Sequence, residues 1–111
     1  MEILKLLEQY ASITEFEVEN YKSWETGFYV RLKITFKNKS ILYVKEYFSE
    51  TERNYSYHWQ TKDEALIIRW DNSPHYPTHS TFPHHKHIGN KISESYEITL
   101  KDVLMYIDND I

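Results

Sequence analysis

Five of the chain's six histidines fall between residues 75 and 87. Histidine gains or loses a proton near neutral pH, and its neutral ring is also a common metal ligand. Polar residues that suit the same chemistry accompany them from residue 69 onward. Such a density of histidine in one short segment is typical of a functional surface, so we expect the active or binding surface to lie between Arg69 and His87.

The residue types in this segment fit acid–base chemistry on RNA without a metal or other cofactor. Cleavage by the neighbouring 2′-hydroxyl needs a base for that hydroxyl, an acid for the leaving oxygen and a cation for the charged phosphorane. The predicted catalytic residues are histidines: His84, His85, His87 and, as a secondary candidate, His75. The predicted substrate-binding residues are their polar neighbours: Arg69, Lys86, Asp71 and Asn72.

Two other interpretations of the same histidines stay open. In the first, histidine nitrogens and an oxygen of Asp71 bind a divalent metal such as zinc or manganese, although the spacing matches no standard zinc motif. The histidines concerned are His84, His85 and His87 with His75 or His79. In the second, the segment has no catalytic role: its histidines bond neighbouring carbonyl or carboxylate groups, or the segment binds and sequesters a partner.

Three stretches of sequence carry a resemblance to a known family. They read YSYHWQ at residues 55–60, IIRWDNSPHY at 67–76 and FPHHKHI at 82–88. Together they resemble the signature of the TumE family of small toxin–antitoxin toxins, and the chain length and helix–strand layout are similar as well. One departure is Tyr76, where a second histidine after His75 is expected. The resemblance implies a growth-inhibiting toxin that a small antitoxin, encoded beside it, neutralises; it does not by itself imply ribonuclease action.

The elements that position these residues can be predicted from periodicity. Apolar residues at helical spacing predict a helix over residues 1–12, and another over 99–110 with Thr99 as N-cap and Asp102 at the third helical position. Alternating apolar and polar residues predict five strands between them. The expected fold is α+β, a single domain over residues 1–111 with an antiparallel meander packed by both helices, in the order α-β-β-β-β-β-α. Residues 71–90, with three prolines, are expected to form a long loop.

One hairpin of this sheet can be predicted in more detail. If Asn38, Lys39 and Ser40 form a three-residue loop, Phe36 lies opposite Leu42. The same register sends a set of cationic and aromatic side chains to the other face of the sheet: Arg31, Lys33, Tyr43, Lys45 and Tyr47. A slip of one residue would reverse every one of these orientations.

Composition limits the remaining possibilities. The chain has 41% hydrophobic residues, no cysteine and a net charge of −4, which indicates a globular protein rather than one coated in basic surface. We expect a cytoplasmic protein, because the first residues lack the pattern of a signal peptide and no apolar run is long enough to cross a membrane. The expected partners are an antitoxin and an RNA substrate; a homo-oligomer and a toxin–antitoxin complex are both compatible with this size.

Overall fold

The structure, a computed structural model, describes residues 2–73, 83–89 and 91–111. Two predicted site residues, His75 and His79, therefore lie outside the described residues. The elements follow one another in the order α1 (Glu2–Leu7), β1 (Ile13–Trp24), β2 (Gly27–Phe36), β3 (Ile41–Phe48), β4 (Arg53–Gln60), β5 (Leu66–Asp71), β6 (His85–Ile88), β7 (Lys91–Glu94) and α2 (Leu100–Asp110).

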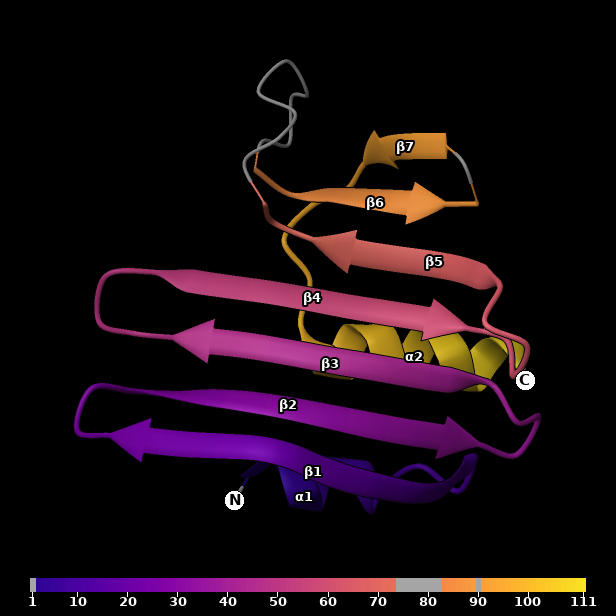
Figure 1. Cartoon of the computed structure of the whole chain (residues 1–111), viewed down its shortest axis with the longest axis horizontal. Coiled ribbons are helices and arrows are strands. Elements are labelled where there is room, and N and C mark those ends of the chain that lie inside the picture. Colours follow the sequence, from indigo (N-terminus) through magenta and orange to yellow (C-terminus); the bar gives the residue numbers. More distant parts are fainter. Residues whose placement is uncertain (1, 74–82, 90) are drawn as a thin grey trace.

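Within these described ranges the strands form one antiparallel sheet of seven, in which each strand pairs with the next along the chain (Figure 1). The α+β class and the meander are confirmed, but the prediction of about five strands was wrong. The two additional strands, β6 and β7, are four residues each and lie in or just after the segment expected to be loop. Their sequences carry little apolar alternation, so pairing, and not local preference, makes them strands: β6 pairs with β5, and β7 pairs with β6.

Both helices lie on one face of the sheet, behind the strands in Figure 1. Their apolar residues join those of the central strands in one core, with Leu7 of α1 and Val103 of α2 almost completely buried. Helix α2 begins as predicted, because Thr99 and Asp102 form a reciprocal capping box. Helix α1 ends at Leu7, earlier than predicted, and a turn leads from it into β1.

The register between β2 and β3 differs from the prediction by two residues. Ile34, and not Phe36, lies opposite Leu42. The turn has four residues between the strands, Lys39 adopts a positive φ of 70°, and the amide of Phe36 donates to the carbonyl oxygen of Ser40 over 3.0 Å. Because side chains alternate with a period of two, this shift leaves the predicted facing of both strands intact.

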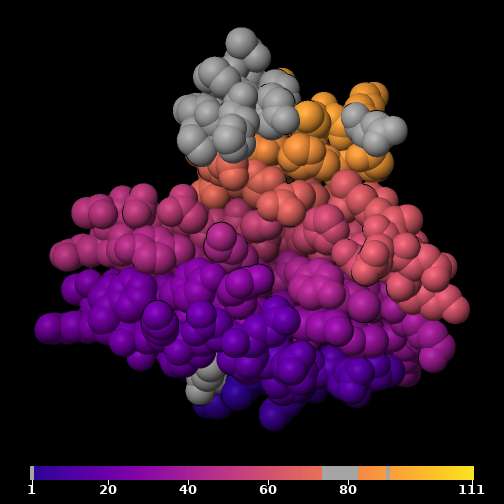
Figure 2. Space-filling view, in the orientation of Figure 1, coloured from indigo at the N-terminus to yellow at the C-terminus, as the bar shows by residue number. Residues whose placement is uncertain are grey.

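The face of the sheet opposite the helices is called the open face here. Figure 2 shows that α2 does not cover it and that side chains of the strands form its surface. Two rows of paired residues cross it from β2 to β6. The first row is Lys33, Tyr43, His58, Arg69 and His87. The second row is Arg31, Lys45, Ser56, Asp71 and His85.

Candidate active site

The site is organised around the carboxylate of Asp71, at the end of β5. This side chain is only 4% exposed, and three polar groups lie within hydrogen-bonding distance of its oxygens. Its Oδ1 lies 2.7 Å from Nε2 of His85 and 3.0 Å from the amide nitrogen of Ser73. Its Oδ2 accepts from Nε of Arg69 over 3.2 Å. A buried carboxylate needs such partners, since a charge removed from water without them is very costly.

His85 is the most deeply buried residue of the site, with 2% of its surface exposed. Its Nε2 faces Asp71, and its Nδ1 lies 3.1 Å from the carbonyl oxygen of Pro83. Both of these partners are hydrogen-bond acceptors. The short contact with Nε2 of His85 fixes the orientation of the carboxylate.

His87, two residues further along β6, is on the same face but more accessible. Its side chain is 24% exposed, its Nε2 lies 3.6 Å from Oδ2 of Asp71, and its ring meets that of His85 edge to face at 5.1 Å. Burial lowers the pKa of His87 below its usual value; Asp71 opposes this effect, while His85 and Arg69 add to it. His87 therefore loses its proton more readily than an ordinary histidine, although the carboxylate beside it opposes that loss.

The sixth histidine, His58 on β4, also belongs to this site and was missed by the sequence analysis. It lies opposite Arg69 in the sheet, with Nη1 of Arg69 3.4 Å from its Nδ1. Burial, and then the positive charge of Arg69, lower the pKa of His58. The alternation of YSYHWQ was the signal that could have found it, because it puts His58 on the face opposite the buried tyrosines.

The predicted trio of His84, His85 and His87 does not lie together. Because side chains alternate along β6, His84 lies on the helix side of the sheet. There it stacks on Tyr55, with ring centroids 5.8 Å apart, and its Nδ1 is 2.8 Å from the tyrosine hydroxyl oxygen. Lys86 is directed to that side as well, opposite Trp70. His84 and Lys86 are therefore separated by the sheet from Arg69 and Asp71.

Asn72, predicted to bind substrate, is engaged with the backbone of β4. Its Oδ1 accepts from the amide nitrogen of Tyr55 over 2.9 Å, and its Nδ2 donates to the carbonyl oxygen of Arg53 over 2.6 Å. These two side-chain hydrogen bonds replace the backbone hydrogen bonds between β4 and β5, which end at Asp71. Asn72 holds the strand that carries Arg69 and Asp71 against β4, which is a positioning role.

Among the described residues, one group has the composition of a metal site. Ligand atoms of Asp71, His85 and His87 all lie within 4.8 Å of one another. The bond from Nδ1 of His85 to a carbonyl oxygen is also the kind that orients a metal-binding histidine. Arg69, however, donates to the same carboxylate, and its fixed positive charge disfavours a cation beside it.

Two hollows adjoin this cluster on the open face. One, of about 300 Å³, is lined among others by Arg31, Tyr43, His58 and Arg69. The other, of about 210 Å³, is lined by residues that include Tyr47, Asn54 and Asn72. Both include Lys45, Ser56 and Arg69, so Arg69 projects where the two meet.

These features define a small sheet domain with three histidines, an arginine and a buried carboxylate beside an open, cationic face. A family model described as Toxin TumE matches residues 3–111. The chain belongs to the TumE toxin family, as its motifs suggested, and this membership assigns it a toxin role and implies an antitoxin partner. No significant match was found among curated proteins or among solved structures. In the part of the chain that the structure describes, no helix has the length and apolar character needed to cross a membrane.

Proposed function

We propose that this toxin inhibits growth by cleaving RNA in the cytoplasm without a metal ion, at a cluster formed by His58, Arg69 and His87. The observation that carries the proposal is the row in which the two histidines flank the arginine on adjacent strands of the open face. Both histidines are partly accessible, and the pKa of each is lowered, so each exchanges its proton on the acid side of neutral pH. Arg69 supplies a permanent cation between them.

In the proposed reaction, His58 accepts the proton of the 2′-hydroxyl and the freed oxygen attacks the adjacent phosphorus. His87 gives a proton to the departing 5′-oxygen, so that the products are a 2′,3′-cyclic phosphate and a 5′-hydroxyl. The guanidinium of Arg69 stabilises the negative charge of the phosphorane. Each proton taken by one histidine is matched by a proton given by the other.

The roles of the two histidines follow from their neighbours. His58 has the cation of Arg69 beside it, which favours the neutral form that a base needs. Among the neighbours of His87, the carboxylate of Asp71 favours the protonated form that an acid needs and offsets part of the effect of burial. Asp71 and buried His85 do not reach the substrate in this scheme; they are positioning residues that orient Arg69 and His87.

Incubation of purified, antitoxin-free protein with total RNA, with and without chelator, tests the proposal. We expect discrete RNA fragments in both conditions, and their loss when His58 or His87 is replaced by alanine. The matched control is His84→Ala, which removes a histidine of the same segment on the other face of the sheet. Intact RNA in both conditions, with a toxin that still arrests growth, would contradict the proposal and favour sequestration of a partner.

The second candidate is a metal-dependent toxin, and the group of Asp71, His85 and His87 is the observation in its favour. In that case these three residues would hold zinc or manganese, and the metal would activate water or polarise a phosphate. Complete loss of activity in chelator, with recovery on addition of zinc or manganese, would support this candidate over the first.

A further inference from the structure

We infer that the open face of β2, β3 and β4 is a binding track for single-stranded RNA that leads to the cluster of His58, Arg69 and His87. The inference rests on the proposed function, from which it takes RNA as the ligand. It adds the form of that RNA and the path by which the RNA reaches the cluster. The track consists of cationic and aromatic side chains: Arg31, Lys33, Lys45, Tyr29, Tyr43 and Tyr47.

The cations of the track lie in register with one another and with the cluster. Arg31 pairs with Lys45 across β2 and β3, and Lys45 leads through Ser56 to Asp71, while Lys33 leads through Tyr43 to His58. Adjacent strands are about 4.8 Å apart, so β2 and β5 are separated by roughly 14 Å, the span of a few nucleotides. Lys45 and Arg31 are exposed, so their charges are available to phosphates.

The aromatic residues are placed differently from those of the core. Tyr57 and Trp59 are fully covered on the helix side, whereas Tyr43 and Tyr47 are only partly buried, on a face that no described helix covers. Trp24 extends this surface, with its ring 5.7 Å from that of Tyr47 and 41% of its surface exposed. Neighbouring side chains cover part of each of these three rings, and the exposed part of each ring is accessible to a base.

This arrangement selects single strands. A base can stack on a tyrosine ring only when it has left the stack of its own helix, and each such contact contributes about 1–3 kcal/mol of binding. The two hollows that share Lys45, Ser56 and Arg69 give such a strand a continuous path to the arginine. A regular duplex offers its phosphates to the lysines but keeps its bases from the rings.

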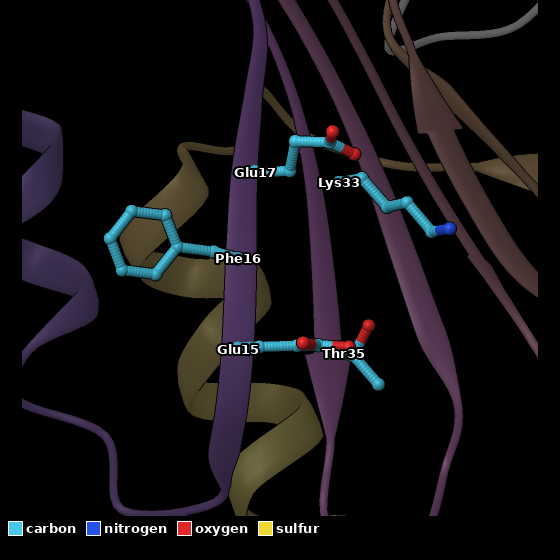
Figure 3. A pocket seen from close by; sticks show the side chains of 5 residues that line it. All are labelled: Glu15, Phe16, Glu17, Lys33 and Thr35. Atoms are coloured by element: carbon cyan, nitrogen blue, oxygen red, sulfur yellow. The ribbon is translucent and has the colours of Figure 1, made fainter.

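The track ends at β1, where the charge changes sign. Figure 3 shows Glu15 and Glu17 on the same side of the sheet as Lys33, while Phe16 points to the opposite side. Glu17 lies directly opposite Lys33 in the register, and both glutamates line a hollow of about 360 Å³ with Lys33 and Thr35. Glu19, further along β1, lines the hollow that contains Arg31. These carboxylates repel phosphate, so we place the boundary of the track between β2 and the part of β1 that carries Glu15, Glu17 and Glu19.

The test is fluorescence anisotropy with a labelled 12-nucleotide RNA whose riboses carry 2′-O-methyl groups. This modification removes the attacking hydroxyl, so the full-length, antitoxin-free protein binds the probe without cleaving it. We expect the single strand to bind more tightly than the same sequence as a duplex. We expect Tyr47→Ala to weaken binding by about 5- to 150-fold, and Arg31→Glu to weaken it and reduce the slope of log K against log salt by about 1.

The matched control is Lys101→Glu, a charge reversal at an exposed position of α2 on the other side of the sheet, which should bind like the wild type. Circular dichroism of each variant checks that it is folded. Equal affinity for duplex and single strand, or wild-type affinity of folded Arg31→Glu and Tyr47→Ala, would overturn the inference. If RNA binds along the track but unmodified RNA is never cut, the proposed function fails and the track stands. If the wild type cuts RNA but Arg31→Glu and Tyr47→Ala bind the probe as tightly as the wild type, the proposed function stands and the track fails.

Discussion

Replacement of Asp71 by asparagine removes one charge from the centre of the site while almost preserving its shape. In the wild type this carboxylate is 4% exposed and is bonded to Arg69, to the backbone at Ser73 and, at 2.7 Å, to buried His85. A hydrogen bond to a charged group contributes about 1.5–3 kcal/mol, and the asparagine oxygen can still accept from some of these partners. We therefore expect the free energy of unfolding to fall by about 2–3 kcal/mol.

Urea unfolding at pH 7, followed by circular dichroism, measures this change directly. The midpoint should fall while the dependence on urea concentration stays the same, because the surface exposed on unfolding is unchanged. Asp63→Asn, at an exposed position of the turn before β5, is the matched control and should be neutral. An Asp71→Asn variant as stable as the wild type would show that the contacts of this carboxylate do not hold the site together, and would refute the positioning role assigned to Asp71 and His85.

The remaining predictions concern activity and the antitoxin. His87→Ala should abolish growth inhibition, whereas His84→Ala should leave a folded, toxic protein, as colony counts after induction would show; equal loss of toxicity in both would contradict the separation of the two faces. The pKa values of His58 and His87 are both lowered, and a bell-shaped pH profile peaks midway between its two pKa values. We therefore expect kcat/KM to be greatest below pH ~6.5. A maximum above pH 7.5 would exclude these residues as the acid–base pair. If the antitoxin covers the open face, its association with the toxin, measured by stopped flow, should become slower as salt rises. Arg31→Glu should slow association further, whereas Lys86→Glu, on the helix side of the sheet, should not. An association rate that does not depend on salt would argue for an indirect mechanism.

Much of the fold could be predicted from the sequence because the pattern of β2 to β4 is strong. The alternation of Leu32 and Ile34 with Arg31 and Lys33 is regular, so the facing of these side chains is correct although the register is shifted by two residues. The capping box of α2 could be predicted because it depends only on residues three apart, Thr99 and Asp102. These are local signals, which a sequence carries in full.

The site could be predicted only in part, because its geometry depends on pairing between distant strands. Counting histidines singles out a segment in which Arg69 and His87 both lie beside Asp71 in the structure. The same count treats His84 as equivalent to His85, because no local sequence pattern shows that residues 85–88 form a strand whose side chains alternate between the two faces. It also misses His58, which is eleven residues from Arg69 in the chain and adjacent to it only through the pairing of β4 with β5.

We propose that this toxin cuts RNA by attack of the 2′-hydroxyl, using histidines and an arginine. Mass spectrometry of the fragments from a short RNA of defined sequence, cleaved in the presence of chelator, tests this reaction. We expect a 2′,3′-cyclic phosphate on the upstream fragment and a 5′-hydroxyl on the downstream one, and no cleavage when the ribose at that position carries a 2′-O-methyl group. Fragments that end in a 3′-hydroxyl and a 5′-phosphate, or cleavage that persists at the methylated ribose, would contradict it.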